Sequence, residues 1–204
     1  MRRAEITEKN RKALIEAAIA DIAEHGYQAA RLGALAERAG LTTGAVYSIF
    51  GSKRALLVAA TRQLVTEFHA TLEPLADPAL SLTEVLRGYA AAMLGHTGTS
   101  RARKRFTFEL ESLTAALRDD ELRAELESQS PQAIPALTRL LTDRVIDSGA
   151  TPTDAHTTPE QAARLAAAVQ ALLSGFAQHC IVTRSEIDHD YAAESAVALT
   201  ALID

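Results

Sequence analysis

The segment GLTTGAVYSIFGSK, from Gly40 to Lys53, decides the fold of the N-terminal part of the chain. On a helical projection of residues 43–50, the apolar side chains of Val46, Ile49 and Phe50 gather on one side. The opposite side is small or polar with one aromatic ring, and it carries Thr43 at its edge, Gly44, Ala45, Tyr47 and Ser48. We therefore predict a short helix that buries one face and offers the other to a partner.

Two further short segments precede this helix. Residues 10–25 and 32–39 both show apolar residues at helical spacing, and Gly26 and Gly40 follow them as helix ends. Thr42 is a predicted N-cap of the 43–50 helix, and Ser52 is in position to cap a longer helix over residues 53–72. The pattern predicts three short helices at the N-terminus, packed together and followed by a long one.

The remaining sequence predicts only helices. They are expected at about 81–96, 101–117, 119–149, 159–184 and 189–203, with Pro131 and Pro135 kinking or splitting the third of these. Residues 147–158 are expected to form a loop, and no strand pattern or internal repeat is evident. We predict an all-α fold of about nine helices, with a helix-turn-helix domain over residues 1–52 and a second helical domain over residues 53–204.

Charge is distributed unevenly along the chain. Residues 1–62 hold ten Lys and Arg against six Asp and Glu, whereas the remainder is acidic, and the whole chain has a net charge of −5. A basic end on an acidic body indicates contact with a polyanion through that end. There is no secretory signal or long apolar run, and Cys180 is the only cysteine, so we expect a reducing cytoplasm and no disulfide.

The 40–53 segment also has the chemistry to contact nucleic acid. Thr42 and Thr43 lie at a helix N-terminus, where unpaired amides attract anions. Tyr47 adds a hydroxyl and Lys53 a point charge, while the small outward face allows close approach to the major groove. From the residues alone, a three-helix subdomain with a solvated Tyr and Lys is an equally good interpretation.

The run from Ala13 to Leu57 resembles the N-terminal domain of TetR-family regulators. The matching residues are Ala17-Ala18, Gly26-Tyr27, Leu35-Ala36-Glu37-Arg38-Ala39-Gly40, Gly44-Ala45-Val46-Tyr47, Phe50, Ser52-Lys53 and Ala55-Leu56-Leu57. The resemblance implies phosphate contacts from Thr42, Tyr47 and Lys53, and base contacts from Thr43, Gly44, Ala45 and Ser48. The chain departs from the family pattern at Ala30 and Arg31, where a Ser or Thr usually stands, and we expect Arg31 to replace that phosphate contact.

The same resemblance implies a homodimer and a small-molecule effector. Candidate dimer residues form apolar stripes on the last two predicted helices, namely Leu165, Val169, Leu172, Phe176, Tyr191, Leu199 and Leu202. Candidate ligand-binding residues on the 81–96 and 101–117 helices are Tyr89, Met93, His96, Phe106, Glu109 and Leu113. Ordinary core packing is the alternative for both sets.

The sequence shows no catalytic constellation, metal-ligand spacing or phosphate-binding loop, and we expect no enzyme, no metal and no cofactor. The predicted function is a ligand-responsive transcriptional regulator, most simply a repressor that a small molecule releases from a palindromic DNA operator. The alternatives are an activator, a helical enzyme or carrier whose DNA-binding head is non-functional, and a helical adaptor that binds a protein through residues 159–184.

Overall fold

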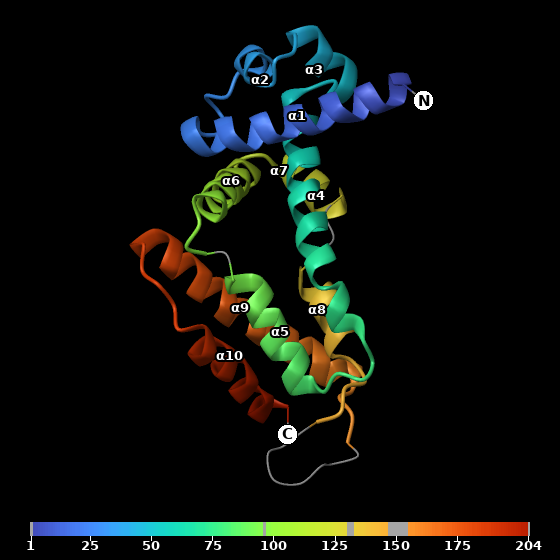
Figure 1. Ribbon diagram of the computed structural model, residues 1–204, viewed down its shortest axis with the longest axis vertical. Helices are drawn as coiled ribbons and strands as arrows, with labels where there is room; N and C mark the ends of the chain where they lie inside the picture. The colour runs from blue at the N-terminus through green and yellow to red at the C-terminus, as the bar shows by residue number, and fades with distance from the viewer. Residues whose placement is uncertain (1, 96, 130–132, 147–154, 204) are drawn as a thin grey trace. The chain divides into compact units, whose positions relative to one another are not determined.

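The computed structural model describes residues 2–95, 97–129, 133–146 and 155–203. Over these residues the chain is all-α, as predicted, and the elements can be followed in Figure 1. In chain order they are α1 (Arg2–His25), α2 (Leu32–Arg38), α3 (Thr43–Phe50), α4 (Lys53–Thr71), the 3₁₀ helix η1 (Glu73–Ala76), α5 (Leu82–Leu94), α6 (Ser100–Ala116), α7 (Asp120–Gln129), α8 (Ala133–Leu141), α9 (Pro159–Thr183), α10 (His189–Ala198) and the 3₁₀ helix η2 (Leu199–Leu202).

The helices follow the sequence prediction except at the start of α1. Helix α1 starts at Arg2 rather than near residue 10, and its residues 3–9 are exposed and mostly polar. The 119–149 segment is split into two helices, α7 and α8, as predicted, so the described ranges hold ten α-helices. Pro135 lies in the first turn of α8, where a missing amide donor costs little. After α8, Val145 pairs with His156 in an isolated antiparallel bridge.

The chain divides into two compact units. The first comprises residues 1–66 with 103–130, which places α1, α2, α3, α6 and α7 together with most of α4. Its core contains the fully buried Leu14, Leu35, Val46 and Leu57, together with Phe108 of α6 and Leu122 of α7. The predicted boundary after residue 52 therefore does not coincide with the limits of this packing unit, because α6 and α7 contribute to its core.

The second unit comprises residues 67–102 with 131–204 and is organised around α9. Helix α9 packs against α8, α5 and α10 (Figure 1). By length and composition α9 could cross a membrane, but the core helix of a soluble protein passes the same test. Leu165, Val169 and Leu173 of α9 are fully buried in the core of this unit, which accounts for much of its apolar character.

Short polar residues fix where several helices begin. Ser81 and Glu84 form a capping box at the start of α5, and Thr158 and Gln161 form another at the start of α9. The Asp188 carboxylate accepts the amides of Asp190 and Tyr191 at the start of α10. These bonds satisfy amides that have no partner inside their helices.

Candidate nucleic-acid interface

Helix α3 has one buried and one exposed face. Val46 is fully buried, and Ile49 and Phe50 are half-buried against the core of the first unit. On the other side Thr43, Gly44 and Ser48 are exposed, Ala45 is half-buried, and Tyr47 is 57% exposed. The side chains predicted to face a nucleic acid are thus the ones that the first unit leaves uncovered.

Thr42 caps α3 as predicted. Its backbone is extended, and its hydroxyl accepts the amide of Ala45 at 3.3 Å. The amides of the first turn then project from the end of the helix beside the exposed face. This arrangement provides anion-attracting donors next to the residues expected to read bases.

Arg31 occupies the N-cap position of α2 in an extended conformation, without any side-chain hydrogen bond to the helix. Its side chain is exposed and has no ion-pair partner within the described ranges. The departure from the family pattern at Ala30 and Arg31 therefore leaves α2 without a side-chain cap, and it leaves a guanidinium group at the surface beside it.

Lys53, at the start of α4, is already engaged within the first unit. Its ammonium donates to the carbonyl oxygens of Tyr27, Gln28 and Ala30 at 2.7, 3.2 and 2.8 Å. It also lies 4.6 Å from the centre of the Tyr27 ring. Partial burial lowers the pKa of this ammonium group. A phosphate contact by Lys53 stays a prediction, and it would require at least one of these carbonyls to be released.

The other cations of the first unit fall into two groups. Arg54 pairs with Asp119 at 2.6 Å and with Glu121 at 2.9 Å. Arg38 donates to Glu24 at 2.6 Å, which lowers the pKa of that carboxyl group. By contrast, a second group is exposed and has no ion-pair partner in the part of the chain that the structure describes: Arg3, Lys9, Lys12, Arg31, Arg62, Arg103 and Arg118. Of these, Arg3, Lys9, Lys12 and Arg31 belong to the segment that carries the helix-turn-helix, and they are available to a polyanion.

Residues 14–60 match the sequence model of the family described as "Bacterial regulatory proteins, tetR family". The match covers the helix-turn-helix elements α2 and α3 with their flanking helices. Over these residues the chain has the sequence pattern of the family's N-terminal domain. The fold is similar to that of solved structures described as TetR-family transcriptional regulators.

Solved structures are similar to this chain over nearly its whole length. A TetR-family member from Streptomyces coelicolor A3 is 24% identical, with a TM-score of 0.69 over 93% of this chain and 97% of that one. The fatty acid degradation regulator FadR from Bacillus halodurans is 18% identical, with a TM-score of 0.64 over 93% of each chain. The multidrug binding protein EbrR complexed with proflavin is 24% identical, with a TM-score of 0.58 over 93% and 99%. No curated protein sequence matches the chain.

The predicted ligand residues are distributed over both units. Tyr89 is fully buried in the second unit, where its hydroxyl donates to the side chain of Gln170 and burial raises its pKa to about 12. Met93 packs half-buried against the same core. In the first unit, Phe106 is half-buried, and Glu109 and Leu113 are exposed on α6. His96 lies outside the described residues.

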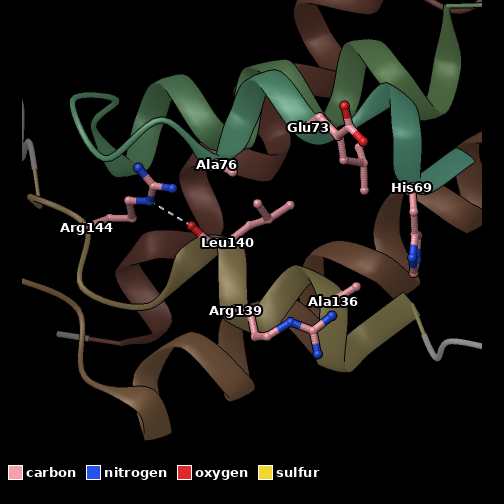
Figure 2. Close-up of a pocket in the computed structure, with 8 residues that line it drawn as sticks. His69, Glu73, Ala76, Ala136, Arg139, Leu140 and Arg144 are labelled. Atoms are coloured by element: carbon pink, nitrogen blue, oxygen red, sulfur yellow. Dashed lines mark hydrogen bonds between the residues drawn. The ribbon is translucent and has the colours of Figure 1, made fainter.

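A pocket of about 310 Å³ lies within the second unit, at a place that the sequence did not indicate. Figure 2 shows it between the end of α4 with η1 and the helix α8. Its lining is His69, Leu72, Glu73, Ala76, Ala136, Arg139, Leu140 and Arg144. Desolvation, together with the charge of Arg139, lowers the pKa of His69.

Arg144 is the most constrained side chain of this pocket, with 6% of its surface exposed. Its guanidinium donates to the carbonyl oxygens of Leu140 at 2.7 Å and Leu75 at 2.9 Å, and also to those of Asp77 and Leu80. Within the described ranges no carboxylate forms an ion pair with Arg144 or with Arg139, which is exposed at the rim. The pocket therefore holds two guanidinium groups against one carboxylate, that of Glu73.

The predicted dimer residues divide by burial. Leu165 and Val169 were wrongly assigned to a dimer surface, because both side chains are fully buried in the core of their own unit. Leu172, Phe176 and Leu199 are half-buried, whereas Tyr191 is 63% and Leu202 53% exposed. The apolar stripe predicted from the sequence thus combines residues of the buried face of α9 with residues of the half-buried face beside it. The exposed apolar side chain of Val182 was missed because it lies beyond that stripe.

Proposed function

We propose that this chain is a homodimeric DNA-binding transcriptional regulator, a repressor that a small organic molecule releases from a palindromic operator. The observation that carries the proposal is the exposed face of α3 in a domain that matches the TetR family. In this proposal Thr43, Gly44, Ala45 and Ser48 contact base edges, while Thr42, Tyr47 and Arg31 contact phosphates. The exposed cations near the start of α1 extend the electrostatic contact.

The direct test is binding to the DNA upstream of the protein's own coding sequence, measured by fluorescence anisotropy at several salt concentrations. We expect tight binding to one site with two-fold symmetry, and an affinity that falls steeply as salt rises. A weak affinity that is the same for unrelated DNA would instead favour the alternative of a helical carrier or enzyme with a non-functional head.

The homodimer is supported by the outward face of α9 and α10. Val182, Tyr191 and Leu202 are large apolar residues that are mostly exposed. Ala167, Ala171 and Gly175 are exposed at four-residue spacing along α9, so a partner helix could approach its backbone closely. Two-fold pairing through this face would present two α3 helices to one operator.

The test of the dimer is a charge placed on this face. We expect Ala171→Arg to convert the dimer to a folded monomer in sedimentation experiments and to abolish operator binding. Ala124→Arg, at an exposed position of α7, is the matched control and should remain dimeric. An Ala171→Arg protein that sediments as a dimer would show that α9 does not form the interface.

We further propose that the effector is an amphiphilic anion bound in the pocket of the second unit. Leu72, Ala76 and Leu140 supply an apolar lining, while Arg139 and Arg144 supply two positive charges against the one carboxylate of Glu73. The volume of about 310 Å³ suits a compact molecule rather than a large one. The multidrug binding protein EbrR, which has a similar fold, is complexed with proflavin, and this supports the proposal of a small organic effector.

Three ligands with the same ten-carbon chain and different head-group charge test whether the pocket requires an anion: decanoate, decanol and decyltrimethylammonium. We expect decanoate to raise the melting temperature most and to release the operator, and Arg139→Ala to weaken this effect about tenfold. Arg164→Ala, on α9 outside the pocket, is the control. Equal responses to all three ligands, or an unchanged response in Arg139→Ala, would contradict an anion site here.

A further inference from the structure

The turn between α1 and α2 is held by a lysine that comes much later in the chain. The Lys53 ammonium donates to the carbonyls of Tyr27, Gln28 and Ala30, which lie 26, 25 and 23 residues earlier. An ammonium group has three N–H donors, and here each has a carbonyl acceptor within 3.2 Å. The Tyr27 ring lies beside the same charge at 4.6 Å.

We propose that Lys53 is a positioning residue for DNA binding: it ties the α1–α2 turn to the start of α4, and thereby sets the placement of α2 and α3, instead of binding a phosphate. This inference rests on the proposed function. On this inference, Lys53 increases DNA affinity through the hydrogen bonds that it donates within the protein and not through the attraction of its charge to a phosphate.

The other residues of the turn show why such a tie is needed. Helix α2 has seven residues, no side-chain cap at Arg31 and an interior glycine, Gly33, so its intrinsic stability is low. Lys53 does not cap the free amides of α2, but its bonds to the carbonyls just before the helix hold the chain where α2 begins. On the other side of the turn, the Glu111 carboxylate of α6 accepts the amide of Tyr27 at 3.1 Å.

The position of α2 determines that of α3. The two helices pack together, and the amide of Leu41 donates back to the carbonyl of Ala36 at 2.8 Å. Buried Leu35 and Ala36 of α2 share a core with Val46 of α3. A displacement of the α1–α2 turn would therefore move the exposed face of α3, which reads bases in the proposed function.

The first experiment separates the two roles of Lys53 by their salt dependence. If Lys53 bound a phosphate in each protomer, its replacement by a neutral residue would reduce the slope of log K against log salt by about 1.8, at about 0.9 for each phosphate. We expect Lys53→Met to bind operator at least about tenfold more weakly than the wild type, with an unchanged slope. A slope reduced by about 1.8 would overturn the proposal.

The second experiment keeps the charge and changes only the donors. In a Lys53→Cys, Cys180→Ala protein, the introduced thiol is alkylated either with 2-bromoethylamine or with (2-bromoethyl)trimethylammonium, and the protein is then refolded. The primary amine restores three N–H donors, and we expect operator affinity within about threefold of the wild type. The trimethylated product has charge but no donors, and should stay about tenfold weaker. Equal recovery by both products would overturn the proposal.

Hydrogen exchange without DNA separates a failure of this inference from a failure of the proposed function. The amide of Leu35 donates to the carbonyl of Arg31 at 3.1 Å, at the start of α2. We expect exchange here and in residues 27–30 to be about tenfold faster in the trimethylated product than in the primary amine product. Equal exchange rates would show that the Lys53 hydrogen bonds do not hold the α1–α2 turn, whether or not the wild type binds DNA. Faster exchange in the trimethylated product, together with no operator binding by the wild type, would refute only the DNA-binding function.

Discussion

Tyr47→Phe is the sharpest test of how α3 contacts DNA, because it removes one hydroxyl and nothing else. The side chain is 57% exposed and makes no hydrogen bond among the described residues, so the free energy of unfolding should change by less than about 0.5 kcal/mol. If each protomer loses one phosphate hydrogen bond of about 1–1.5 kcal/mol, the dimer loses about 2–3 kcal/mol. That loss corresponds to roughly 30- to 150-fold in operator affinity.

The assay is fluorescence anisotropy with the operator and with a set of single base-pair variants. Because a phosphate contact carries no sequence information, Tyr47→Phe should weaken binding to every variant by the same factor. The salt dependence should be unchanged, since the hydroxyl is uncharged. Ser48→Ala is the comparison, and it should change the order of preference among the variants. An unchanged affinity in Tyr47→Phe, or the same change of preference in both proteins, would refute the assignment of roles.

Three further predictions concern stability. Burial lowers the pKa of His69 below its ordinary 6.5, so as the pH falls the unfolded chain takes up this proton before the folded one. At pH values under about 6.5, the free energy of unfolding measured in urea should therefore decrease more steeply in the wild type than in His69→Gln. Glu111→Ala leaves the amide of Tyr27 without its acceptor and should cost about 1–2 kcal/mol, whereas Glu16→Ala, at an exposed position of α1, should cost little. Gly26→Ala should lower the free energy of unfolding by more than the strain of about 1–2 kcal/mol expected for an alanine at positive φ, because its Cβ would lie 3.1 Å from the Glu111 side chain. Gly40→Ala, where the Cβ has open space, should therefore have the higher melting temperature of the two.

The local structure of residues 40–53 could be predicted from the sequence because helix caps and apolar periodicity depend on residues close together in the chain. The cap at Thr42 and the helix over residues 43–50 depend on neighbours within four residues, and periodicity and capping rules describe such neighbours directly. The early start of α1 was missed for the same reason. Residues 3–9 are exposed and mostly polar, so they show no apolar period, although they continue the helix.

Contacts between distant segments could not be predicted in this way. A lysine at a helix start suggests a solvated charge, and nothing near Lys53 in sequence indicates that three carbonyls from residues 27–30 return to it. An apolar stripe on α9 looks the same in sequence whether it packs inside one chain or against a second copy. For this reason Leu165, which is fully buried in its own unit, was assigned to the wrong surface. The pocket combines residues 69–76 with residues 136–144, which share no motif.

The distribution of ion pairs has a consequence for where the proposed DNA contact gains its strength. With Lys53, Arg38 and Arg54 engaged inside the first unit, the exposed cations without ion-pair partners among the described residues of α1 to α3 are Arg3, Lys9 and Lys12 on α1 and Arg31 before α2. If all four bound phosphates in both protomers, the slope of log K against log salt would approach about −7, at about 0.9 for each contact. Most of this slope would come from α1, which is helical from Arg2 and therefore holds Arg3, Lys9 and Lys12 at fixed spacing. Removal of residues 2–9 should then lower the slope more than removal of any charge on α2, α3 or α4, even though the base-reading face lies on α3.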